Sequence, residues 1–163
     1  MGIGGETAKN IGIVLGGGAL AGLAAGALTA GHGPPAAAAG VAPAPIVASF
    51  GLCHTGGGTN CVVDGDTFWI DGEKVRVADI DAPETHPPRC AHEADLGERA
   101  TLRLQALLNA GPVTLAAADR DTDRYGRLLR IVERNGRSLG GQLVAEGLAR
   151  PWTGRRLPWC DGD

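Results

Sequence analysis

The sequence predicts an α+β domain that follows an apolar N-terminal segment. Runs of β-branched and aromatic residues are bounded by tight-turn signals, one long segment has apolar residues at helical spacing, and a serine caps a second, shorter helix. The chain has 163 residues, which is enough for one domain with a real core. We therefore expect one folded α+β domain.

The first part of the chain differs in composition from the rest. Residues 11–31 carry no charge and are rich in Ala, Gly and Leu. A membrane-spanning helix needs roughly twenty apolar residues, and small residues near position 30 also suit signal cleavage. A buried helix is less favoured because glycine is a poor helix former. We expect residues 1–31 to be a signal or membrane anchor, 32–52 an Ala/Pro-rich linker, and 53–163 the folded domain.

The folded part begins with two expected strands. Residues 61–70 are rich in β-branched and aromatic side chains and predict a strand. Asp71-Gly72 is a hairpin turn signal, so residues 74–80, which alternate, should form the partner strand. Ala82-Pro83 ends that strand, because proline has no N–H for the ladder.

A helix should follow, over roughly residues 93–109. It ends at Gly111-Pro112. One face carries its apolar residues at helical spacing, namely Ala100, Leu104, Leu107 and Leu108.

The remaining elements alternate again. Residues 113–118 and 128–133 should be strands, and Asn135-Gly136 a second tight turn. Ser138 should cap a short helix that ends at Gly147. The tail beyond this helix has no clear period.

The charge is unevenly distributed. The net charge is −3, but acidic residues gather between positions 64 and 98 and arginines between positions 120 and 156. A cation bound by the acidic group would leave a site that attracts phosphate. We expect any nucleic-acid affinity to depend on salt and to be weaker than that of a strongly basic protein.

Three short segments carry the functional chemistry. They read DGDT at 64–67, RVADIDAPE at 76–84 and DRYGR at 123–127. Carboxylates bind a hard cation through oxygen, and arginine holds phosphate with a fixed fork of donors. Together these groups are the parts needed to hydrolyse a phosphodiester.

In this order and spacing, the three segments resemble the staphylococcal nuclease (thermonuclease) family, from about Cys61 to about Trp152. The resemblance implies a five-stranded OB-fold barrel with packed helices. OB barrels bind single-stranded nucleic acid on one face.

The resemblance also assigns roles to individual residues. Asp66, Asp81 and the backbone carbonyl of Ala82 match the calcium ligands, although the best-known family member has threonine at the last position. Glu84 matches the candidate general base, or the residue that orients the attacking water. We expect Asp64 and Asp79 to be turn and solvated positions.

Four further residues match phosphate contacts of the family. Arg76 and Arg127 should hold the scissile phosphate and stabilise the charge of the transition state. Arg124 and Tyr125 should touch a terminal phosphate.

Four cysteines, an even number beside an export segment, favour disulfides. Three pairings are possible; we favour Cys53 with Cys61 and Cys90 with Cys160. The alternative is a zinc site made by His86, Cys90, His92 and Cys160, whose spacing fits no common zinc pattern well.

We therefore expect an exported, monomeric, Ca²⁺-dependent nuclease that is secreted, periplasmic or anchored to the membrane by the N-terminal segment. It should hydrolyse DNA and RNA with little sequence specificity, prefer single strands and leave 3′-phosphate ends. The alternatives are a non-catalytic nucleic-acid-binding OB module and a structural or anchored protein.

Overall fold

The structure is a computed structural model that describes residues 43–53 and 59–160. Every described residue belongs to one compact unit, residues 40–163. The export or anchor segment expected at 1–31 lies outside the described residues. No helix in the described part is both long enough and apolar enough to span a membrane.

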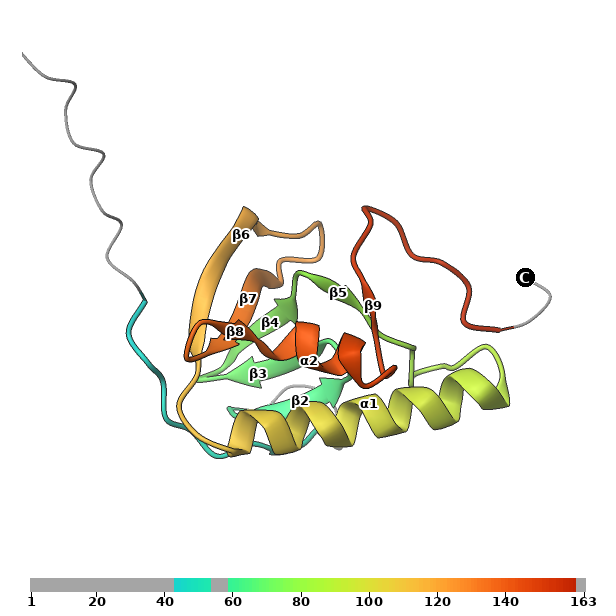
Figure 1. Cartoon of the computed structure of the whole chain (residues 1–163), viewed down its shortest axis with the longest axis horizontal. Helices are drawn as coiled ribbons and strands as arrows, with labels where there is room; N and C mark the ends of the chain where they lie inside the picture. The colour runs from blue at the N-terminus through green and yellow to red at the C-terminus, as the bar shows by residue number, and fades with distance from the viewer. Residues whose placement is uncertain (1–42, 54–58, 161–163) are drawn as a thin grey trace, which may run out of the picture. The chain divides into compact units, whose positions relative to one another are not determined.

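The described part is an α+β domain with a mixed sheet and two helices (Figure 1). Its elements are, in chain order, β1 (Gly51–Leu52), β2 (Cys61–Asp64), β3 (Thr67–Ile70), β4 (Glu73–Val77), β5 (Ile80–Asp81), α1 (Ala91–Asn109), β6 (Thr114–Thr122), β7 (Leu128–Arg134), β8 (Arg137–Ser138), α2 (Leu139–Ala145) and β9 (Arg150–Pro151).

The main sheet has the strand order β1-β2-β3-β4-β7-β6, with β8 added to β7. β4 and β7 are parallel, whereas the hairpins β2–β3, β3–β4 and β6–β7 are antiparallel. β5 and β9 form a separate antiparallel pair. The pairings among the described strands do not close a barrel, so the expected five-stranded barrel is not observed.

The segment before β2 belongs to the folded domain. Ile46 forms a β-bridge with Val113, and β1 pairs with β2, so this segment reaches from one edge of the sheet to the other. Phe50 is 3% exposed and its ring packs edge-on against Phe68. The folded domain therefore extends N-terminal of Cys53, into residues that the composition had placed in the linker.

The two tight turns expected from sequence are present. Asp71 and Gly72 have φ angles of 50° and 82° between β3 and β4, and Asn135 and Gly136 have φ angles of 51° and 72° between β7 and β8. These left-handed conformations are the ones that such pairs adopt most readily.

The first expected strand is instead two strands. Residues 61–70 fold back at Gly65-Asp66, which forms the turn between β2 and β3. A Cβ on Gly65 would lie 2.6 Å from Cβ of Ala100 and 2.8 Å from Cβ of Ala82. The turn therefore packs against α1 and the loop after β5 at a distance that only glycine permits. Asp66 lies in this turn, not within a strand.

Both helices begin with a cap. α1 starts two residues earlier than expected, where Cys90 Sγ accepts the N–H of Glu93. Its expected apolar face is buried against the core. Ser138 Oγ accepts the N–H of Gly141 at 2.9 Å, which confirms the cap of α2. Asp79 is not solvated as expected, because it is half-buried and accepts the hydroxyl of Ser138 at 2.5 Å.

Candidate active site

Two buried carboxylates converge at the end of the β5–β9 pair. Asp66 is 2% exposed and Asp81 is 3% exposed. The guanidinium of Arg156 lies 3.9 Å from Asp66 Oδ2 and 3.6 Å from Asp81 Oδ1. The N–H of Ala82 points to Asp66 Oδ2 at 3.4 Å. The fold thus brings Asp66, Asp81 and Ala82 close together.

The chemistry of this group suits a hard cation. Asp81 Oδ1 is buried and lacks a hydrogen-bond partner among the described residues. Burial raises the pKa of Asp81, and Arg156 opposes the shift. A cation would satisfy such an oxygen. Two carboxylates are nevertheless a small set, and the described residues hold no group of three or more His, Cys, Asp or Glu side chains arranged to bind a metal.

Arg76 lies on β4, between β3 and β7, and is 6% exposed. Its Nη1 donates to Asp66 Oδ2 at 2.5 Å and its Nη2 to the carbonyl of Ile80 at 3.3 Å. The indole of Trp152 lies 5.4 Å from the guanidinium. A charge buried this deeply needs such partners. Arg76 is therefore fixed beside the acidic pair.

Arg127 is held by Asp123, the first residue of its own motif. Asp123 Oδ1 accepts the N–H groups of Tyr125 and Arg127 at 2.9 and 3.0 Å, which closes the loop between β6 and β7. Its Oδ2 accepts Arg127 Nε at 2.7 Å, and Arg127 Nη1 reaches Thr67 Oγ1 at 3.4 Å. Burial favours a higher pKa for Asp123, but these hydrogen bonds outweigh it and the pKa is lowered. This support of Arg127 by Asp123 was not expected from the sequence.

Arg124 and Tyr125 form an exposed pair on the same loop. Arg124 Nη2 donates to the Tyr125 hydroxyl at 2.5 Å, and its guanidinium lies 4.7 Å from the ring centroid. Arg127 also approaches this ring, at 5.5 Å. The Tyr125 side chain, 68% exposed, is open to solvent beside the two arginines.

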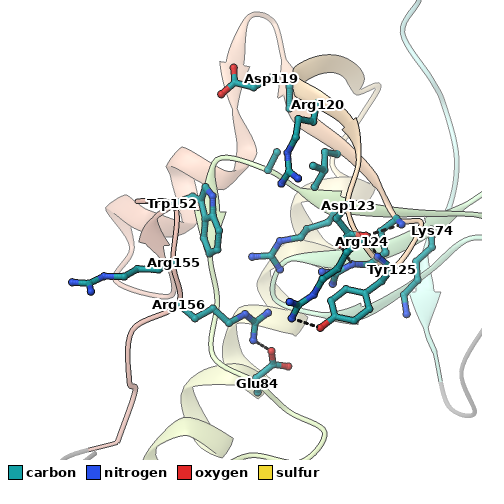
Figure 2. Close-up of a pocket in the computed structure, with 16 residues that line it drawn as sticks. Lys74, Glu84, Asp119, Arg120, Asp123, Arg124, Tyr125, Trp152, Arg155 and Arg156 are labelled. Carbon is teal, nitrogen blue, oxygen red and sulfur yellow. Dashed lines mark hydrogen bonds and ion pairs between the residues drawn. The ribbon is translucent and has the colours of Figure 1, made fainter.

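Glu84 follows Pro83 in the loop after β5 and forms an ion pair with Arg156 (Figure 2). Its backbone N–H points to Glu93 Oε1 at 3.4 Å. Glu93 is fully buried at the start of α1 and also accepts the N–H of Arg89 at 2.7 Å. Burial favours a higher pKa for Glu93, but the contacts with Arg89 outweigh it and the pKa is lowered. Glu93 thus holds the loop that presents Glu84.

Sequence reasoning missed Glu93, although C-x-x-E at 90–93 has the spacing of a capping box. Asp64 behaves partly as expected: its Oδ1 accepts the N–H of Asp66 at 3.1 Å in a turn. Burial and the carboxylate of Asp66 raise the pKa of Asp64 to about 7.

A pocket of about 990 Å³ joins these groups. Arg76, Glu84, Arg124, Tyr125 and Arg127 all line it. In Figure 2, Trp152 and Arg156 lie on one side of the pocket, Asp123, Arg124 and Tyr125 on the other, and Glu84 beneath. Asp66 and Asp81 are not among the lining residues; they lie beside the pocket, in contact with Arg76 and Arg156.

All four cysteines are in disulfides, Cys53 with Cys61 and Cys90 with Cys160, which is the favoured pairing. The zinc alternative is wrong, because the bonds consume both of the cysteines that it needed.

The α+β domain thus places two arginines and a glutamate in one pocket, beside a buried carboxylate pair, and guanidinium groups are the side chains best suited to a phosphate group. The family model described as Staphylococcal nuclease homologue matches residues 74–156, about half of the chain. The chain therefore belongs to the staphylococcal nuclease family. The matched region includes Arg76, Asp81, Glu84 and Arg127 and begins after Asp66.

Two curated proteins of Bacillus subtilis (strain 168) are similar to this chain. Endonuclease YncB is 40% identical over 93 residues, which are 54% of this chain and 44% of the relative. The SPbeta prophage-derived endonuclease YokF is also 40% identical over 93 residues, covering 54% of this chain and 31% of the relative. The chain thus spans less than half the length of either relative.

Proposed function

We propose that this chain is a nuclease that hydrolyses phosphodiester bonds of DNA and RNA, with little sequence specificity and a preference for single strands. The observation that carries the proposal is the shared pocket of Arg76, Arg127 and Glu84, with two buried carboxylates beside it. The names of the two similar endonucleases support the same reaction class.

We propose Ca²⁺ as the cofactor, held by Asp66, Asp81 and the carbonyl of Ala82. The buried Asp81 Oδ1 without a hydrogen-bond partner supports this, since oxygen ligands of this kind suit a hard cation. When bound, the ion supplies Lewis-acid stabilisation of charge on the phosphate.

Two arginine side chains bind the scissile phosphate in the proposed reaction. Arg76 and Arg127 donate hydrogen bonds to the non-bridging oxygens of the scissile phosphate, where negative charge develops. Both guanidinium groups are pre-positioned by carboxylates, Asp66 and Asp123 respectively. Positioning of this kind avoids reorganisation during the reaction.

Glu84 orients the attacking water and accepts its proton. The water oxygen bonds to phosphorus in line with the bond that breaks, P–O5′, and the departing 5′ oxygen takes up a proton from solvent. The product then carries a 3′-phosphate. Glu84 can act in this way only when its carboxylate is not engaged by Arg156.

The preference for single strands is supported by exposed aromatic rings at the pocket. Tyr125 is 68% exposed and Trp152 is 39% exposed, and both line it. Unpaired bases stack on such rings, whereas the bases of a duplex are already stacked on each other.

We also propose that the protein works outside the reducing cytoplasm. The two disulfides support this, since such bonds persist in oxidising compartments. Whether residues 1–31 are cleaved or remain as an anchor is decided by sequencing the N-terminus of the mature protein.

A cleavage assay tests the proposed reaction. The full chain is incubated with single-stranded DNA, duplex DNA and RNA, with Ca²⁺ and then with excess chelator, and product ends are mapped. We expect calcium-dependent cleavage that is faster on single strands and leaves 3′-phosphates. Binding without cleavage in calcium would contradict the proposal and favour the non-catalytic module.

A further inference from the structure

The C-terminal tail, residues 152–160, is fixed at both ends across the candidate site. It starts at the β5–β9 pair, where Arg150 is the register partner of Asp81 and Trp152 N–H donates to the carbonyl of Asp79 at 2.9 Å. It ends at Cys160, which is bonded to Cys90 at the N-terminus of α1. The tail therefore has little freedom to leave the site as a whole.

Arg150 also fixes the path between these ends. Its guanidinium donates to the carbonyls of Leu157 and Pro158 at 2.9 and 3.0 Å and lies 3.5 Å from the ring centroid of Trp159. These contacts hold the segment that directly follows Arg156, so they direct the Arg156 side chain toward the acidic residues.

Arg156 contacts all three carboxylates that we propose to hold the metal ion or to activate the water. Its guanidinium lies within 3.9 Å of Asp66 and 3.6 Å of Asp81, and it is ion-paired with Glu84. The neighbouring Arg155 points away from Glu84 in Figure 2. Arg150 also lies 3.6 Å from Asp81, and Arg76 is paired with Asp66. Arg156 differs from both because it pairs with all three carboxylates, Asp66, Asp81 and Glu84.

Electrostatic repulsion prevents the Arg156 guanidinium and a metal ion from binding the same carboxylates at the same time. Three carboxylates in one small region repel each other unless a positive charge lies among them. Arg76 on Asp66 and Arg150 on Asp81 supply part of that charge. Arg156 adds a third guanidinium, which is the most exposed of the three and therefore the one most free to leave, and a divalent cation bound to Asp66 and Asp81 would supply a further charge. A guanidinium and a dication separated by only a few ångströms repel strongly in a partly buried site.

We propose that Arg156 is an internal counter-cation that competes with the divalent metal ion for Asp66, Asp81 and Glu84. Binding of the metal ion requires the Arg156 guanidinium to leave the carboxylates, and its departure also frees Glu84 for the attacking water. The disulfide at Cys160 keeps the guanidinium within reach, so it returns when the ion dissociates. This inference rests on the proposed metal site.

Two opposite effects of removing the guanidinium follow. Without its competitor, the metal ion should bind more tightly. Without the metal ion, the carboxylates lose a counter-charge, and the domain should unfold more easily. Calcium should therefore stabilise an Arg156 variant more than it stabilises the wild type, because the stabilisation by a ligand of the folded state increases with the logarithm of its affinity.

Isothermal titration of Ca²⁺ into the full oxidised chain, without nucleic acid, tests the proposal. The proteins are the wild type, Arg156→Gln, the matched control Arg155→Gln, and Asp81→Asn. We expect Arg156→Gln to bind calcium roughly fivefold more tightly, which is about the effect of one partly exposed ion pair. Arg155→Gln should stay within about twofold of the wild type.

Thermal unfolding of the same proteins, with chelator and with saturating calcium, is the second readout. Arg156→Gln should have a lower Tm than Arg155→Gln in chelator and should gain more from calcium. If Arg156→Gln binds calcium no more tightly than the wild type while Asp81→Asn loses binding, the counter-cation role of Arg156 is overturned and the metal site stands. Absence of calcium binding in both the wild type and Arg156→Gln overturns the proposed metal site and this inference with it.

Discussion

Asp123 holds Arg127 twice: one carboxylate oxygen accepts the backbone N–H of Arg127 at 3.0 Å, and the other accepts its side-chain Nε at 2.7 Å. The same carboxylate closes the loop that carries Arg127. Asp123 thus sets both the position and the direction of a guanidinium that we assign to the scissile phosphate.

We predict that Asp123→Ala lowers kcat on single-stranded DNA by roughly tenfold, less than loss of Arg127 itself. The guanidinium stays in the variant but loses its fixed direction. KM should rise as well, because Asp123 Oδ1 also holds the N–H of Tyr125 and so fixes the loop that carries Arg124 and Tyr125. Steady-state kinetics checks this, with Asp95→Ala as the control, since Asp95 forms an exposed ion pair with Arg99 on α1. An unchanged kcat in folded Asp123→Ala would show that Arg127 needs no such support.

Loss of a carboxylate from the buried pair should abolish most calcium binding. Asp66→Ala and Asp81→Ala each remove a charged ligand from a site with few ligands. Calorimetry with the wild type as reference is the measurement. If both variants keep the wild-type affinity, the metal is bound elsewhere. Asp66→Ala should also impair turnover through a second route, because Arg76 loses its partner at 2.5 Å.

Glu93 should make stability depend on pH. Its folded-state pKa lies below the ordinary value of 4.5, so ionised Glu93 contributes stability that is fully present above that value and is lost as the pH falls through the folded-state pKa. We predict that Glu93→Gln is less stable than the wild type by about 1–3 kcal/mol at pH 7, and that the gap narrows below about pH 4.5.

Urea unfolding at pH 7, 5 and 3.5 measures this gap. Glu98→Gln, an exposed position on the same helix, is the control and should show little gap at any pH. A gap for Glu93→Gln that persists undiminished at pH 3.5 would mean that the amide perturbs packing, not charge.

The two disulfides should differ in their effect on stability. Cys90 and Cys160 are separated by 70 residues, and Cys53 and Cys61 by 8. In the chain-entropy model, the long link contributes roughly 4 kcal/mol and the short one roughly 2.5 kcal/mol. Chemical unfolding of Cys90→Ser/Cys160→Ser and Cys53→Ser/Cys61→Ser, at saturating calcium, should therefore show the larger loss in the first. The reverse order would mean that the short link, which closes the segment before β2, matters more than its loop length suggests.

Local chemistry explains what the sequence could predict of the fold. Asp71-Gly72 and Asn135-Gly136 specify their turns through φ angles that these residues tolerate, and Ser138 specifies a cap through its hydroxyl. The sequence does contain a local turn signal at Asp64-Gly65, but the β-branched and aromatic residues around it favoured one continuous strand over residues 61–70. What requires glycine there is contact with Ala82 and Ala100, which lie far along the chain.

The candidate site likewise has residues that local motifs predict and one residue that only non-local contacts place. The motifs placed Arg76, Glu84 and Arg127, which the fold brings to one pocket. Arg156 could not be found in this way, because the tail has no helical or strand period. Its position follows from the β5–β9 pair at one end and the Cys90–Cys160 bond at the other, both of which are non-local.

The central claim is that Arg76 and Arg127 act together on one scissile phosphate. Single-turnover cleavage of single-stranded DNA in saturating calcium tests it most directly, with wild type, Arg76→Ala, Arg127→Ala, Arg127→Lys and the exposed control Arg99→Ala. We predict that the cleavage rate falls by roughly 10² or more in Arg76→Ala and in Arg127→Ala. Arg127→Lys should also cleave slowly, because an ammonium group cannot make the bidentate hydrogen bonds of a guanidinium. Arg99→Ala should cleave at the wild-type rate. Losses below tenfold in folded Arg76→Ala and Arg127→Ala would contradict the account.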